Sequence, residues 1–210
     1  METYTTEEQQ VEAIKKFWKE NGVSIIVGIV AGLGGVGGYK WYQGEVVAKK
    51  EAASTAYDAA VKDLSADNTT QVESFIKDNA GSGYAELASL MLAKTLVEAG
   101  ELDKAASQLE WVVKNASKPE VKALANYRLA RIQVAQEKLD AALALTNQTF
   151  PESFSAQISE LQGDIYLKQG NLEKARESYQ AAADSDGLQG NPALQMKLDD
   201  LAVNSQVVGL

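Results

Sequence analysis

Gly170-Asn-Leu-Glu-Lys-Ala175 is the stretch that decides the fold, because two other blocks of the chain resemble it. These blocks are Gly100-Glu-Leu-Asp-Lys-Ala105 and Glu137-Lys-Leu-Asp-Ala-Ala142, so the aligned alanines are 37 and 33 residues apart. Twelve residues before each alanine stands a small residue, namely Ala93, Ala130 and Gly163. Two helices approach closely only where the facing side chains are small, so this spacing predicts three helix pairs.

A period near ~34 residues is typical of tetratricopeptide repeats, each of which is a pair of helices. The third unit fits best, since Tyr166, Tyr179 and Ala182 stand at the usual positions. The second unit departs most, with Gln133 in place of a bulky apolar residue and Thr146 in a later position. Its extra residues predict a lengthened turn around 115–120. We expect repeats at about 86–118, 123–152 and 156–186, followed by a capping helix, because the ends of a solenoid must cover their core.

Helical periodicity extends over the rest of the chain after Gln43, with apolar residues three and four apart. The expected helices are 69–78, 83–98, 102–115, 120–135, 138–148, 153–168, 172–184 and 192–202. A helix over 43–64 is expected to continue from the preceding segment, since only Gly44 intervenes. Pro119, Pro151 and Pro192 fall between helices or in first turns, where a missing N–H does no harm. Asn191 before Pro192 predicts an N-cap.

A stretch of 19 uncharged residues, from Asn21 to Tyr39, precedes this helical body. As a helix it is about 28 Å long, close to the ~30 Å hydrocarbon core of a bilayer. Aromatic residues flank it, as they do at membrane interfaces. A cleaved signal peptide is the alternative, but the preceding tail has five Glu against three Lys, and the apolar run exceeds the ~7–15 residues of a signal peptide's apolar h-region. An uncleaved anchor is therefore favoured, although the flanking lysines are tied and do not orient it.

Seven of the chain's 16 glycines lie in this segment. Gly28, Gly32 and Gly35 fall on one helix face, and such a groove permits close contact with another helix in lipid. The alternative is that glycine is simply common in membrane spans. We expect an all-α protein, with one N-terminal transmembrane helix followed by a tetratricopeptide-like α-solenoid. Its parts are a tail (1–21), the span (22–42), a juxtamembrane helical segment (43–80) and the repeat domain (81–210).

Composition excludes several classes of function. The chain has no Cys and no His, which removes thiol nucleophiles, Cys/His zinc sites and imidazole triads. A net charge of −9 opposes binding to nucleic acid. Neither a P-loop nor a dinucleotide motif occurs, so we expect no cofactor and no metal. The neighbouring carboxylates Glu7/Glu8 and Asp199/Asp200 point apart on a helix and have no partner base, so they are not expected to act in acid–base catalysis. We expect a protein that is not an enzyme.

Helix-pair arrays bind other proteins on the concave surface formed by the first helix of each pair. By tetratricopeptide geometry this surface includes six residues: Leu90, Lys94, Tyr127, Arg131, Glu160 and Asp164. Tyr127 and Arg131 lie one turn apart, a combination suited to gripping a peptide by stacking and bidentate hydrogen bonds. The alternative is that these side chains only brace adjacent helices.

The tail and span resemble the YfgM family in Gln10-Val-Glu-Ala-Ile-Lys-Lys-Phe-Trp-Lys-Glu-Asn-Gly22 and Tyr39-Lys-Trp-Tyr42. The resemblance continues through Tyr84-Ala-Glu-Leu-Ala-Ser89 and Tyr127-Arg-Leu-Ala-Arg131 and loosens after about Asn147. It implies a single-pass protein of the bacterial inner membrane, with its N-terminus in the cytoplasm and its repeat domain in the periplasm.

The resemblance further implies an ancillary subunit of the SecYEG translocon. The implied partners are SecYEG, a PpiD-like periplasmic chaperone and unfolded exported proteins, which the subunit would help to hand on for folding. The alternative function is a membrane-anchored tetratricopeptide scaffold for another cell-envelope complex.

Overall fold

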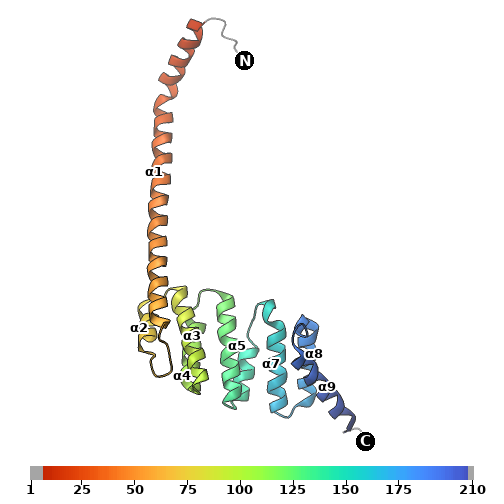
Figure 1. Ribbon diagram of the computed structural model, residues 1–210. Helices are drawn as coiled ribbons and strands as arrows, with labels where there is room; N and C mark the ends of the chain where they lie inside the picture. The colour runs from red at the N-terminus through yellow and green to blue at the C-terminus, as the bar shows by residue number, and fades with distance from the viewer. Residues whose placement is uncertain (1–6, 208–210) are drawn as a thin grey trace. The chain divides into compact units, whose positions relative to one another are not determined.

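The computed structural model describes residues 7–207 and is helical almost throughout (Figure 1). The chain divides into two compact units, Met1–Ala53 and Ser54–Leu210. The helices are α1 (Glu7–Val61), α2 (Thr70–Asp78), α3 (Gly83–Glu98), α4 (Leu102–Asn115), α5 (Pro119–Ala135), α6 (Leu139–Thr146), α7 (Ser155–Lys168), α8 (Leu172–Ala182) and α9 (Pro192–Val207), with a 3-10 turn at Glu152–Phe154 and a π-turn at Ala183–Gly187. One isolated antiparallel bridge joins Ser65 to Asn68 in the described chain.

The described part of the first unit consists of helix α1, which continues without a break into the second unit. Its apolar side chains between Val23 and Tyr42 are mostly exposed. Among the described residues, α1 is the one helix long and apolar enough to cross a membrane.

The second unit is a row of helix pairs: α3 with α4, α5 with α6, and α7 with α8 (Figure 1). This confirms the all-α solenoid predicted from the repeated blocks. The aligned alanines Ala105, Ala142 and Ala175 are each fully buried. The small residues that precede them are buried too, as expected for the points where paired helices approach.

The same turn ends the first helix of each pair, and it explains the repeated blocks. Backbone hydrogen bonds run from Glu101 N to Leu96 O (2.8 Å), from Lys138 N to Gln133 O (2.9 Å) and from Asn171 N to Tyr166 O (2.9 Å). This is the pattern of a Schellman cap, which requires a positive φ at the residue before the donor. Gly100 and Gly170 supply it with φ of 79° and 77°, whereas the second unit places Glu137 there with φ of 61°.

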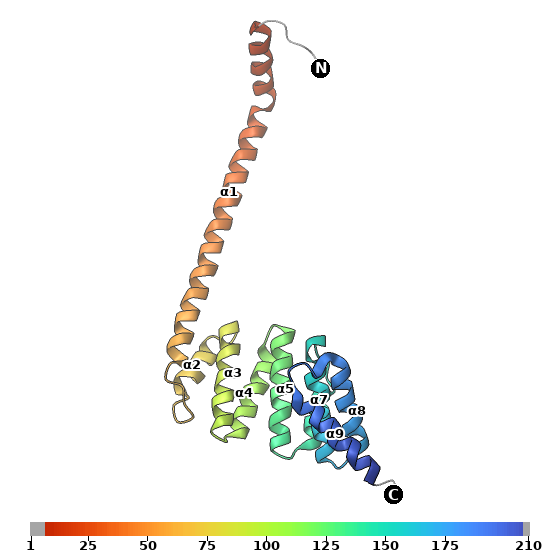
Figure 2. The same ribbon diagram turned by 45° about the vertical axis from the view of Figure 1, so that its right-hand side comes forward.

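Side-chain caps mark the helix starts that the sequence predicts best. Asn191 accepts a hydrogen bond from Leu194 N at 3.3 Å, and Pro192 is the first residue of α9, as predicted. Ser82 and Asn171 cap α3 and α8 in the same way. Helix α9 packs on α8 and extends to Val207, five residues beyond the expected end (Figure 2).

The lengthened turn predicted around 115–120 is wrong. Only residues 116–118 separate α4 from α5, and the extra residues lie instead in these two helices, which have 14 and 17 residues where α6 and α7 have 8 and 14. The added turn of α4 is stable because Val112 and Ala116 are buried in the core.

The core of the described residues forms three clusters of buried side chains. The largest joins the end of α1 and helices α2 to α5, a second lies between α5, α6 and α7, and a third joins α8 to α9. Tyr57 from the end of α1 packs against Phe75 and Tyr84, with ring centroids 6.1 and 5.8 Å apart. The residues expected as a juxtamembrane segment therefore divide at Ser54, and those after it share the core of the repeats.

Candidate functional site

Helices α3, α5 and α7, the first helices of the three pairs, line two neighbouring hollows. The first hollow has a volume of about 390 Å³ and lies between α3, α4 and α5. Its apolar lining consists of Ala93, Val97, Leu102, Leu109, Ile132 and Ala135. The charged side chains in its wall are Lys94, Glu98, Arg128 and Arg131.

The second hollow has a volume of about 260 Å³ and lies between α5 and α7. Its lining combines apolar Val134, Leu161 and Leu167 with charged Arg131, Asp164 and Lys168. Arg131 thus belongs to the walls of both hollows.

Tyr127 and Arg131 meet as their spacing of one helical turn predicts. The Arg131 guanidinium carbon lies 5.7 Å from the centroid of the Tyr127 ring, within the range of a cation–π contact. Tyr127 is half-buried against the cluster between α5 and α7, whereas Arg131 is exposed. The ring therefore supports the guanidinium from one side and leaves its N–H groups accessible.

Two other residues expected on this surface differ in their accessibility. Lys94 is exposed and pairs with Glu98 across one turn of α3, with Nζ 3.6 Å from Oε1. An exposed pair of this kind is easily opened. Leu90 is only 7% exposed and belongs to the largest core cluster, so its side chain stabilises the repeat unit and is not available to a partner.

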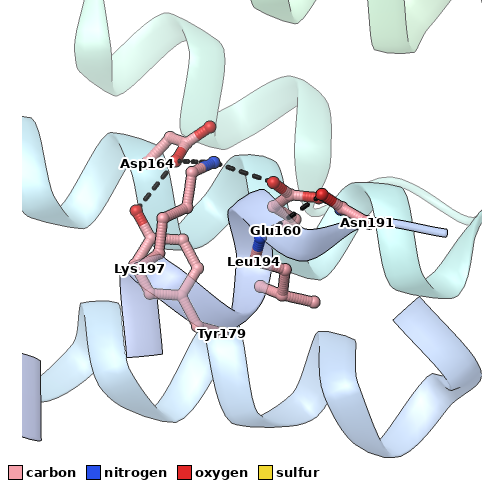
Figure 3. A network of polar contacts seen from close by, with 6 residues as sticks. All are labelled: Glu160, Asp164, Tyr179, Asn191, Leu194 and Lys197. Atoms are coloured by element: carbon pink, nitrogen blue, oxygen red, sulfur yellow. Dashed lines mark hydrogen bonds and ion pairs between the residues drawn. The ribbon is translucent and has the colours of Figure 1, made fainter. Parts of the chain in front are cut away.

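Glu160 and Asp164 are occupied by the C-terminal helix (Figure 3). Lys197 of α9 places Nζ 2.8 Å from Glu160 Oε1 and 2.7 Å from Asp164 Oδ1. Tyr179 donates its hydroxyl proton to Asp164 Oδ1 at 2.8 Å, and Asn191 Nδ2 donates to Glu160 Oε2 at 2.8 Å. These two carboxylates therefore brace α7 against α8 and α9.

This network shifts the pKa of two groups. Burial raises the pKa of the Tyr179 phenol far above its ordinary value, and the hydrogen bond to Asp164 adds to the shift. Burial alone would lower the pKa of Lys197, but its hydrogen bonds to Asp164 and Glu160 outweigh that effect and raise the pKa. Tyr179 is thus held neutral and Lys197 charged, which are the states the geometry requires.

The predicted helix-packing face of α1 is open within the chain. Gly28, Gly32 and Gly35 are exposed, and a Cβ added at any of them would have no atom within 4 Å. By contrast, the Trp18 ring covers Gly22 at 3.5 Å. Among the described residues, no group of three or more acidic side chains is placed to hold a metal ion.

Comparison with known proteins identifies the family. The tetratricopeptide repeat-like domain family matches residues 15–203. A protein of Escherichia coli strain K12, named ancillary SecYEG translocon subunit, is 37% identical over 97% of this chain and 100% of its own length. The chain belongs to the YfgM family.

One further relative supports the family, and one solved structure shares the fold. A Haemophilus influenzae relative with the same name is 30% identical over 93% of this chain and 97% of its own length. The crystal structure of MamA matches with a TM-score of 0.52 over 75% of this chain and 83% of its own, at 17% identity. The MamA likeness supports the solenoid fold alone.

Two residues of this YfgM family member belong to the site but were not predicted from the sequence. Arg128 lines the first hollow one turn before Arg131, and the signal for it was available, because these are two of only three arginines in the chain. Lys197 gave no such signal, since its carboxylate partners are 33 and 37 residues away.

Proposed function

We propose that this chain is a non-enzymatic ancillary subunit of the SecYEG translocon, anchored in the bacterial inner membrane by α1. The observation that carries the proposal is the extent of the similarity. Relatives named for this role match over almost their whole length, so the anchor and the repeat unit are both shared. A relative that shared only the repeats would support no more than a helical scaffold.

The proposed orientation places the N-terminus in the cytoplasm and the repeat unit in the periplasm. The absence of cysteine fits an oxidising compartment, although the tied lysine counts give no direction. Protease added to the outside of spheroplasts should digest the repeat unit, whereas protease added to inverted membrane vesicles should not. The reverse pattern would overturn the orientation.

The proposed mechanism uses two protein-binding surfaces. The glycine face of α1 would pack against a translocon helix, because small residues let two backbones approach closely in lipid. The surface around the two hollows would bind a PpiD-like chaperone or an unfolded exported segment. Within it, Lys94, Tyr127 and Arg131 are the proposed contact residues, while Leu90, Glu160 and Asp164 support the fold.

Photo-crosslinking in native membranes tests which proteins contact the two proposed binding surfaces. A photoreactive residue at Gly28 or Gly32 should capture a translocon subunit, and Val30 provides the control because it lies on the opposite face of the same helix. One at Tyr127 should capture a chaperone or an exported protein. Capture of another envelope complex from these positions, with no translocon product, would favour the alternative scaffold function.

A further inference from the structure

We propose that the first hollow binds an acidic segment of a partner protein, one that places an apolar side chain in the hollow and a neighbouring carboxylate on Arg128 and Arg131. This inference rests on the proposed function, since it assumes that the repeat unit acts by binding protein. It adds the chemical class of the bound segment and the residues that select it.

The charges of the first hollow carry the inference. The chain as a whole has a net charge of −9, yet two of its three arginines stand together in this wall. In the described part of the chain, neither guanidinium has a carboxylate partner or a hydrogen bond. The same wall contains one carboxylate, Glu98, and one further cation, Lys94, whose charges cancel whether or not the two side chains pair. Two unneutralised positive charges therefore remain.

The position of Arg131 suits it to bind a carboxylate. Its guanidinium rests on the Tyr127 ring at 5.7 Å, which restricts the side chain without using any of its N–H donors. A guanidinium held in this way loses less rotamer entropy when it forms the two parallel hydrogen bonds that a carboxylate accepts. Arg128, on the same face of α5, provides the second positive charge.

The lining of the hollow selects an apolar neighbour for that carboxylate. Apolar side chains cover much of it, and Val97 is 42% exposed despite being a large hydrophobic residue. A volume of about 390 Å³ lies within the range of ~300–1,000 Å³ that binds small molecules. A protein segment is the occupant that fits best, because Arg131 also lines the second hollow and an elongated ligand would contact both.

Peptide binding to the full-length chain in detergent micelles tests the inference. The probe is a short fluorescent peptide of alternating Leu and Glu, compared by fluorescence anisotropy with versions that carry Gln or Lys in place of Glu. The Glu peptide should bind more tightly than the other two, and its affinity should fall as salt is added, because partly exposed charges are screened.

Matched variants assign the binding to this hollow. Arg128→Gln and Arg131→Gln should each weaken the Glu peptide about tenfold or more, the loss expected for a charge-assisted hydrogen bond. Arg176→Gln, which removes the exposed third arginine on α8, should leave the affinity unchanged. The double variant Arg128→Glu/Arg131→Glu should instead prefer the Lys peptide, which shows that the fold is intact.

Three results would overturn the inference. The first is equal binding of the Gln and Glu peptides, and the second is an equal loss from Arg176→Gln. The third is self-association of the chain that Arg128→Gln abolishes, because the hollow would then bind a second copy. Crosslinking from Gly28 in the Arg128→Gln/Arg131→Gln variant separates the two proposals. If Gly28 still captures a translocon subunit but the parent chain binds no Glu peptide, the inference about the first hollow is rejected and the proposed function stands. If the parent chain binds the Glu peptide but Gly28 captures no translocon subunit, the proposed function alone is rejected.

Discussion

At the scale of single residues, the contact between Gly163 and Tyr179 sets how closely α7 and α8 approach. A Cβ added at Gly163 would lie 2.3 Å from both Cδ1 and Cε1 of the Tyr179 ring. The ring cannot move aside, since it is fully buried and its hydroxyl is bound to Asp164. Gly163→Ala should therefore lower the free energy of unfolding by about 1–3 kcal/mol, the usual range for overpacking, measured by urea denaturation.

Gly83→Ala is the matched control for that substitution. Gly83 begins α3 and has no atom within 4 Å of an added Cβ. Its replacement should change the free energy of unfolding by less than about 0.5 kcal/mol. Equal effects at the two positions would show that α7 and α8 do not meet as closely as described.

The turn after α5 contains a second residue-scale feature. Glu137 has φ of 61° at the position where the other two repeats have glycine. A left-handed conformation costs a non-glycine residue about 1–2 kcal/mol, so replacing Glu137 with glycine removes that cost. The greater freedom of glycine in the unfolded chain offsets part of the resulting gain in stability. Glu137→Gly should raise the free energy of unfolding by up to about 1 kcal/mol in urea denaturation. Glu137→Ala keeps the positive φ and should give no such gain.

At the scale of elements, α9 depends on the contacts of Lys197 with Glu160 and Asp164. Lys197→Met would leave two partly buried carboxylates side by side without a counter-ion. The expected loss of stability is about 1–2 kcal/mol, between the values for exposed and buried ion pairs. Amide hydrogen exchange in α9 should accelerate while exchange in α3 stays unchanged.

Lys104→Met is the control for α9, because it removes an exposed ion pair between Lys104 in the first turn of α4 and Glu101, the residue just before that helix. Its effect on stability should be small, and α9 should exchange as in the parent chain. Slow exchange of α9 in the Lys197→Met variant would show that apolar packing alone holds this helix.

The same network predicts how stability responds to alkaline pH. The pKa values of Tyr179 and Lys197 are both raised by folding. Their contributions are therefore complete below about pH 10, where both groups keep their protons in the unfolded chain as well. They fall as the pH rises towards the folded values, because the unfolded chain then loses its protons first. Urea denaturation between about pH 8 and pH 11 should show a steeper loss for the parent chain than for Tyr179→Phe.

Most helices were predictable because their signals are local. Apolar residues repeat three and four apart, and the small residues at Ala93, Ala130 and Gly163 mark where paired helices meet. The bounds of α4 were predicted correctly as 102–115, but the lengthened turn expected after it was wrong, since extra residues in a repeat can lie in its helices as well as in a turn. The candidate surface was predicted only in part. The geometry of the repeat indicates which helix face is turned inwards, but not that Lys197 covers part of it from another helix.

At the scale of the whole molecule, the unit boundary at Ser54 gives a test by truncation. The end of α1 contributes Tyr57, which packs on Phe75 and Tyr84, and Ala60, which is buried. A fragment covering 54–210 should fold with the denaturant midpoint of the repeat unit in the full-length chain. A fragment covering 62–210 loses these contacts and should be less stable by roughly 2 kcal/mol. Equal midpoints for the two fragments would place the boundary after α1.

The division of the core into three clusters has a consequence for mechanical load. Stability in a repeat array is local, since each unit contacts only its neighbours. The cluster between α8 and α9 is much smaller than the one that joins α2 to α5. In a chain fixed in a membrane by α1, a force applied at the C-terminus should therefore open α9 and α8 first. The last repeat would unfold and lengthen the chain, which lowers the tension on the remaining repeats and leaves them folded.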